Sequence, residues 1–245
     1  MARYVGVIPL IVMMAATAVF AGACGTQRGG TQQVGEMQRE SQSIQAENAQ
    51  SVRANLRMGA GELNLTGGAD QLMEADFAYN VPDWKPKVNY DVSGDMGELT
   101  VRQGDGGGVR LGGDARNEWD IRFNDEVPTN LSVQMGAGES DLDLDDLTLT
   151  GLELEMGAGR TTIDLTGDYE RDLVASIQGG VGQATVQLPS EVGVRVEAQG
   201  GLGEINAEGL QKEGEAYVND AYGDSEDTLD VDIQGGVGQI NLEVV

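Results

Sequence analysis

The fold is decided by a glycine phrase that recurs along the chain, first as Met58-Gly59-Ala60-Gly61-Glu62-Leu63-Asn64-Leu65. The later copies are Met135-Gly136-Ala137-Gly138-Glu139, Met156-Gly157-Ala158-Gly159-Arg160, Gly179-Gly180-Val181-Gly182-Gln183, Gly200-Gly201-Leu202-Gly203-Glu204 and Gly235-Gly236-Val237-Gly238-Gln239. Each copy is a Gly-x-Gly corner followed by alternating apolar residues. The spacing is 21 residues from Gly138 to Gly159, then 23 to Gly182 and 21 to Gly203. This period predicts stacked structural repeats.

Alternating apolar and polar side chains in the second half predict strands that bury one face. Leu142/Leu144, Leu147/Leu149 and Leu152/Leu154 alternate, with breaks between the pairs. These pairs predict three short strands and three corners in each repeat. Since one repeat cannot bury its apolar face alone, neighbouring repeats must complete the core. The sequence therefore predicts an all-β fold, a right-handed β-helix-like β-solenoid with about 21–23 residues per repeat. An antiparallel sandwich is the alternative, but it needs short turns between paired strands.

The chain before these repeats predicts a β-rich N-terminal domain. We place this domain at residues 38–130 and the repeats at residues 131–245. An edge strand is expected near residues 41–45 and a half-buried strand at residues 51–58. The large aromatic residues of this part are expected in the core, because buried aromatics contribute most to core energetics; they are Phe77, Tyr79, Trp84, Tyr90, Trp119 and Phe123.

The first residues have the pattern of an export signal that ends at the only cysteine of the chain. Arg3 precedes an apolar run over residues 5–20, and small residues lead to Cys24, which is the order of a secretory signal. A transmembrane anchor is the alternative, because the run is at the short edge for a span. The ending Ala21-Gly22-Ala23-Cys24 resembles the bacterial lipobox.

We therefore expect a lipoprotein signal peptide at residues 1–23, lipidation of Cys24, and a flexible tether at residues 24–37. The alternative is that Cys24 is an incidental small residue of a cleaved signal. Lipidation would place the protein in the cell envelope, exported and anchored at the outer membrane or cell surface.

The charge of the chain indicates which partners suit it. The sequence holds 41 acidic and 15 basic residues, a formal net charge of −26, and no histidine. Such a surface repels nucleic acid and attracts cations or basic partners. The lack of histidine removes the commonest general acid–base group.

Two stretches of the chain have features of calcium-binding patterns. Asp141, Asp143 and Asp145 alternate along one predicted strand, with Asp146 beside them, and calcium takes several such oxygen ligands. A solvated acidic face is the favoured interpretation. The glycines at 179–182 resemble a calcium-binding nonapeptide repeat, but Ala184 stands where the liganding Asp belongs. We therefore expect no metal site, no cofactor and no catalytic residues.

Four stretches of the chain resemble the bacterial toast-rack family: LRMGAGELNLTGGADQLMEADFAYNVPDWKPKVNY (56–90), NEWDIRF (117–123), VPTNLSVQMGAGESDLDLDDLTL (127–149) and GLELEMGAGRTTIDL (151–165). That family has a toast-rack N-terminal domain followed by adhesin-like β-repeats, and it is related to C-terminal domains of proteins that respond to cell-wall-active antibiotics. The resemblance covers residues 38–245. It implies an all-β, surface-exposed protein and brings no catalytic residues.

We expect a non-enzymatic envelope lipoprotein whose β-solenoid presents a binding surface in an adhesin-like role. An accessory role in the envelope-stress response to wall-active antibiotics is the alternative. The stress-response relatives are usually anchored by membrane helices, and we expect no such helices here, which argues against direct signalling. A glycan-active enzyme is the third reading, since two acids could meet in a groove. The expected partners are the membrane, through the lipid, and a protein or glycan at the cell surface. A homodimer, formed through an uncovered last strand near Val244-Val245, stays open.

Overall fold

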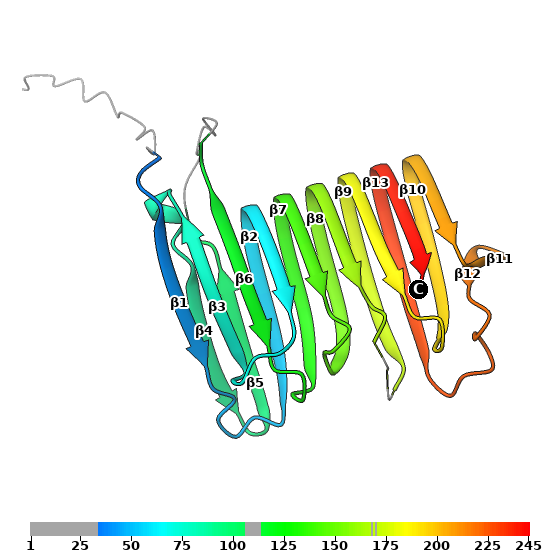
Figure 1. The fold of residues 1–245 in the computed structure, drawn as a ribbon, viewed down its shortest axis with the longest axis horizontal. Helices are drawn as coiled ribbons and strands as arrows, with labels where there is room; N and C mark the ends of the chain where they lie inside the picture. The colour runs from blue at the N-terminus through cyan, green and yellow to red at the C-terminus, as the bar shows by residue number, and fades with distance from the viewer. Residues whose placement is uncertain (1–33, 106–113, 168, 170) are drawn as a thin grey trace, which may run out of the picture. The chain divides into compact units, whose positions relative to one another are not determined.

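A computed structural model describes residues 34–105, 114–167, 169 and 171–245. All thirteen strands belong to one sheet (Figure 1). Six strands are long, at 15 to 17 residues each: β2 (Ser51–Thr66), β7 (Thr129–Asp143), β8 (Leu149–Asp164), β9 (Leu173–Leu188), β10 (Gly193–Glu208) and β13 (Thr228–Val244). The all-β prediction is confirmed. Helical structure within the described ranges is limited to the 3-10 turn η1 (Pro82–Trp84), and no helix there is long and apolar enough to cross a membrane.

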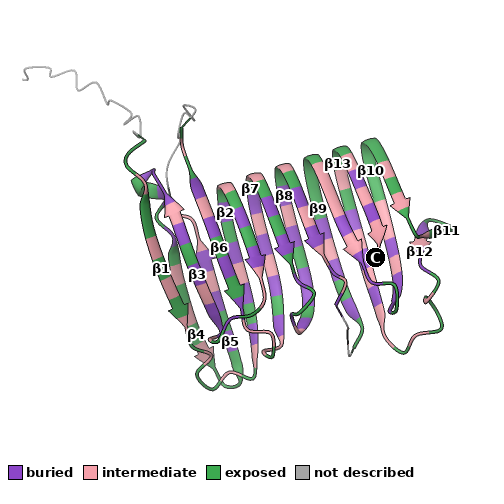
Figure 2. Ribbon diagram, in the orientation of Figure 1, coloured by how far each residue is buried: buried purple, intermediate pink, exposed green. Residues whose placement is uncertain are grey.

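Each long strand bends at its glycine phrase into two arms. In β7, Leu131, Val133 and Met135 are buried before the bend, and Ser140 and Leu142 are buried after it. The buried positions therefore change from odd to even numbers across Gly138. This slip keeps the apolar side chains of both arms on the inside of the bend, where they form the core. Figure 2 shows the buried residues alternating along both arms and the exposed residues gathered at the bends.

The bent strands stack in parallel and in register. Each phrase lies beside the same phrase of the next strand, so that Gly61, Gly138, Gly159, Gly182, Gly238 and Gly203 form one row. Neighbouring strands of a sheet lie about 4.8 Å apart. Each repeat therefore contains one long bent strand, and the prediction of three short strands in each repeat is wrong. The break at Thr150-Gly151 is a local shift of register inside β8, and the glycine phrase bends a strand without ending it.

The order of the long strands is β2-β7-β8-β9-β13-β10. A solenoid coiling in chain order would place β10 directly on β9. Instead, β13 pairs with β9 on one side and with β10 on the other, both in parallel. The expectation that the last strand, near Val244-Val245, is uncovered is therefore wrong. β9, β10 and β13 carry the same Gly-Gly-x-Gly phrase, so the phrase by itself is compatible with more than one stacking order.

The short strands extend the two ends of the stack, and they comprise β1 (Gln38–Ile44), β3 (Met73–Tyr79), β4 (Lys87–Ser93), β5 (Met96–Arg102), β6 (Asn117–Phe123), β11 (Gln211–Glu213) and β12 (Ala216–Val218). The first arm of β2 is continued by β5 and β4, and its second arm is continued by β6, β3 and β1. The predicted edge strand is thus β1, whose only strand partner among the described residues is β3.

The predicted aromatic core is confirmed around β3 and β6. Phe77 and Trp119 are buried, and their rings meet edge to face with centroids 5.4 Å apart. Tyr79, Trp84 and Phe123 are buried as well. Tyr90 is half-buried, and its hydroxyl donates to the carbonyl oxygen of Ala46 at 2.9 Å. Because β2 pairs with β7, the residues before and after position 130 share one sheet; the division into residues 38–130 and 131–245 stays a prediction.

Candidate binding surface

The bend of each long strand needs glycine for two physical reasons. Gly138 and Gly159 have φ angles of 137° and 142°, a region that residues with a side chain rarely adopt. In addition, a Cβ on Gly159 would overlap the carbonyl oxygen of Gly138, and a Cβ on Gly138 would overlap that of Gly61. The row of glycines therefore lets successive backbones approach closely at the bend.

The side chains at the bend change between the first three long strands and the last three. Met58, Met135 and Met156 are buried in β2, β7 and β8. The positions in register with them are Gly179 in β9, Gly235 in β13 and Gly200 in β10. The next-but-one residue after each of these positions is alanine in β2, β7 and β8. In β9, β13 and β10 it is Val181, Val237 and Leu202, whose side chains are 58%, 50% and 73% exposed. The bends of the last three strands thus lose an internal side chain and gain exposed apolar surface.

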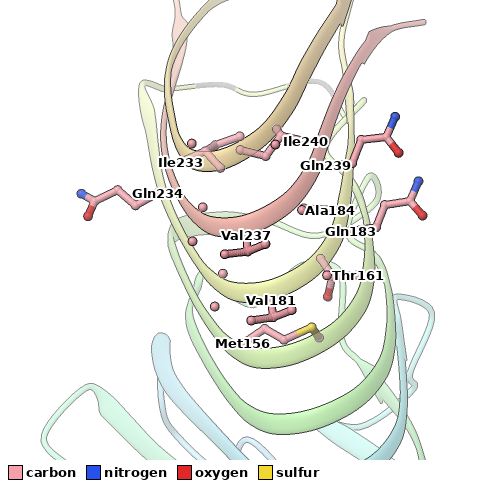
Figure 3. Close-up of a pocket in the computed structure, with 18 of the residues that line it drawn as sticks. Met156, Thr161, Val181, Gln183, Ala184, Ile233, Gln234, Val237, Gln239 and Ile240 are labelled. Carbon is pink, nitrogen blue, oxygen red and sulfur yellow. The ribbon is translucent and has the colours of Figure 1, made fainter.

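An apolar pocket results at these three bends (Figure 3). Its volume is about 50 Å³, and Met156, Ile177, Ile233 and Ile240 line it together with the glycines. Ile233 and Ile240 come from opposite arms of β13 and both face the interior, whereas Gln183 and Gln239 point away from it. Drug-sized ligands need about 300–1,000 Å³, so this pocket fits a single side chain or a few waters rather than a cofactor.

The outward positions of the second arm also form rows across the stack. One row runs Glu62, Glu139, Arg160, Gln183, Gln239 and Glu204. Within it, Arg160 pairs with Glu139 of the preceding strand at 3.0 Å. A second row, two residues later in each strand, contains Thr185, Asn241 and Asn206. In this row the Nδ2 of Asn206 donates to the Oδ1 of Asn241 at 3.0 Å, and the Nδ2 of Asn241 donates to the Oγ1 of Thr185 at 3.4 Å. Polar groups therefore link successive strands on this face.

The stack ends differently on its two arms at β10. The first arm of β10 is covered by β12, which pairs with residues 195–197, and β11 pairs with β12 in turn. The second arm, residues 199–208, pairs with β13 on one side only, and no other described strand pairs with it. We call residues 199–208 the open arm. In Figure 1, β10 is the last long strand of the stack, with β12 and β11 beside it.

The predicted acidic residues lie around the end of β7. Asp141 and Asp143 are exposed on β7, and Asp145 and Asp146 are exposed in the turn that follows. Partial desolvation, a hydrogen bond with Asp145 and repulsion from Asp145, Asp164 and Asp146 raise the pKa of Asp143 to about 6. Within the described ranges, no three His, Cys, Asp or Glu side chains form a group that could hold a metal ion.

The structure brings forward features that the sequence analysis missed. Cys24 lies outside the described residues. The pocket and the open arm were not predicted, although the change from Met-Gly-Ala-Gly to Gly-Gly-Val-Gly is visible in the sequence and signals the lost side chain. The open arm leaves no such signal, because it depends on which strand lies beside which.

A stack of in-register, glycine-bent parallel strands, extended at both ends by short strands, defines the class of this protein. The family described as the N-terminal domain of toast_rack matches residues 33–187, more than half of the chain. The chain belongs to this family, as the resemblance indicated. No curated protein matches the chain.

A solved structure with similarity in both sequence and fold is a "putative cell adhesion protein" from Clostridium sporogenes, 37% identical, with a TM-score of 0.83. The match covers 86% of this chain and 100% of that one. A "putative adhesin" from Bacteroides fragilis is 10% identical, with coverage of 84% and 97% and a TM-score of 0.31, a likeness too low to carry an argument.

Proposed function

We propose that this protein is a non-enzymatic lipoprotein of the cell envelope that uses its stacked strands as a binding surface in an adhesin-like role. The observation that carries the proposal is the match to the clostridial "putative cell adhesion protein", which extends over the whole of that chain at 37% identity. The known relatives indicate no enzyme family, and the pocket offers apolar surface rather than paired acids and bases.

The proposed position in the cell rests on the signal-like pattern of residues 1–23 and on Cys24. A lipid on Cys24 would hold the fold at a membrane surface through the tether of residues 24–37. The formal net charge of −26 would direct binding toward basic or cation-bearing surfaces and away from nucleic acid. In this proposal the repeats coil as a right-handed β-solenoid, with β13 inserted between β9 and β10.

Lipid anchoring at a membrane is tested by comparing the intact mass and the membrane partitioning of the native protein with those of a Cys24→Ala variant. We expect the native protein to carry lipid and to sediment with membranes, and the variant to do neither. An unmodified Cys24 would overturn the lipoprotein part of the proposal.

The binding role is tested by deleting the gene and measuring attachment of the bacterium to peptidoglycan-coated and protein-coated surfaces. We expect attachment to fall and to return when the native chain is restored, but to return poorly with Cys24→Ala. Unchanged attachment would overturn the adhesin-like role. A changed transcriptional response to wall-active antibiotics in the same deletion strain would favour the stress-response role in its place.

A further inference from the structure

We propose that the open arm of β10 is a docking edge for an extended strand supplied by a cationic partner. The inference deepens the proposed function by locating the binding site and describing the chemistry of the partner. It rests on that function only for its setting at the cell surface.

The backbone of the open arm is ready to pair. Along an edge strand, every second residue presents its N–H and C=O to solvent, and such an edge serves as a template for another strand. Natural edges are commonly blocked by proline, by a bulge or by a covering segment. The open arm contains no proline, and none of the described strands covers it, whereas β12 covers the first arm. Addition of a strand to a free edge is a recurring mode of peptide recognition.

The outward side chains of the open arm favour a basic partner. Glu204 ends the row in which Arg160 pairs with Glu139 of the preceding strand. A lysine or arginine on the next strand would repeat that pairing. Glu208 lies in register with Glu243 of β13, so two like charges already face each other there. A cation beside Glu208 would relieve this repulsion.

Asn206, between these two acids, specifies the middle of the partner strand. Its Nδ2 donates to Asn241, which leaves the Oδ1 of Asn206 able to accept from a further strand. An asparagine at that place would extend the amide ladder by one rung.

The inward side chains of the open arm leave the core incomplete. Ile205 and Ala207 are half-buried, although Ile240 and Leu242, in register with them on β13, are buried. Apolar side chains on an added strand would cover Ile205 and Ala207 and bury apolar area. The matching partner therefore alternates basic, apolar, amide, apolar and basic residues.

A second copy of this chain is a poor occupant. Each copy carries a formal net charge of −26, and two open arms brought together would bring their glutamates together as well. A partner that follows the whole bend would also need glycine beside Gly203, because successive backbones approach too closely there for a Cβ. A straight basic strand that pairs with residues 204–208 avoids both problems.

The test uses the full-length chain and a labelled peptide, Gly-Gly-Lys-Ile-Asn-Val-Lys-Gly-Gly, whose charge pattern reads alike in both directions. We expect saturable binding by fluorescence anisotropy and slower hydrogen exchange within residues 204–208. Glu204→Lys with Glu208→Lys should weaken binding about tenfold. The same double variant should bind a peptide with glutamate in place of both lysines better than the native chain does.

The matched control is Asp70→Lys with Glu126→Lys, which changes the net charge equally at exposed positions remote from β10. This variant should bind the lysine peptide within about twofold of the native chain. Equal weakening by both double variants, absence of binding, or slowed exchange elsewhere than on the open arm would overturn the inference. Attachment of whole cells is a separate readout, so peptide binding without attachment would contradict the adhesin-like role and leave the docking edge standing.

Discussion

Glycines that share one motif have different roles at the level of single residues. Gly159 has a φ of 142° and lies against the backbone of the preceding strand, whereas a Cβ on Gly179 would meet no atom within 4 Å. The first glycine is required by the backbone. The second is permissive, and it stands where the earlier strands carry a buried methionine.

We expect Gly159→Ala to destabilise the fold by about 3–4 kcal/mol, because it combines backbone strain with overlap at the bend. Gly179→Ala should stay within about 1 kcal/mol of the native chain. Urea unfolding of both variants checks this. Equal losses would show that the two glycines are equivalent.

Ser140 and Thr161 form a polar pair inside the core. Both are buried, and their hydroxyls are hydrogen-bonded to each other. Thr161→Val should cost about 1–3 kcal/mol, because it leaves the hydroxyl of Ser140 buried without this partner. Adding Ser140→Ala should recover part of the loss, since both polar groups are then gone. If the double variant in urea unfolding is less stable than Thr161→Val, the explanation fails.

The raised pKa of Asp143 predicts how the contribution of this residue to the free energy of unfolding depends on pH. A carboxyl group with a folded-state pKa of about 6 and an unfolded value near 4 binds more protons when folded. Its contribution to the stability of the fold is therefore fully present below about pH 4 and is lost as the pH rises through 6.

Asp143→Asn should raise the melting temperature at pH 7.5 and make little difference at pH 4. The gain should stay below about 1 kcal/mol, because Asp143 is exposed and solvent screens its neighbours. Thermal unfolding across this pH range gives the comparison. A variant that is less stable than the native chain at pH 7.5 would contradict the assignment.

At the level of strands, β13 lies inside the stack, between β9 and β10, although it comes last of these three in the sequence. β13 is the parallel neighbour of both β9 and β10. In a solenoid stacked in chain order, losing the last strand would remove only the outermost rung.

We expect a chain truncated after Asp227 to lose hydrogen-exchange protection throughout β10 as well as at the exposed side of β9. Protection in β7 and β8 should persist, because these strands keep both parallel neighbours. Removing residues 209–218, which contain β11 and β12, is the control and should affect only the first arm of β10. Full protection of β10 without β13 would contradict the observed order.

The whole molecule carries an unbalanced charge. With 41 acidic and 15 basic residues, self-repulsion disfavours the compact state, and salt screens it. The described ion pairs include exposed ones such as Arg160–Glu139, and exposed pairs stabilise little.

Raising NaCl from about 0.02 to 0.5 M should therefore raise the melting temperature by a few degrees. Choline chloride at equal ionic strength should act equally, because screening does not depend on the identity of the cation. A much larger gain with CaCl₂ at matched ionic strength would instead support specific calcium binding by the acids around Asp143.

The sequence by itself determined the all-β class, the bends at the glycine phrases and most of the buried aromatic residues, because these depend on local properties. Alternation of side chains selects a strand face, and Gly-x-Gly permits a backbone that other residues disfavour. The stacking order, the pocket and the open arm were decided only by the tertiary structure. The Gly-Gly-x-Gly phrase is the same in β9, β10 and β13, so the connections and the pairing of β11 and β12 with β10 select the order. An edge is free only when no other strand pairs with it. Pairing between residues 35 positions apart, as between Gly203 and Gly238, cannot be predicted from the local sequence.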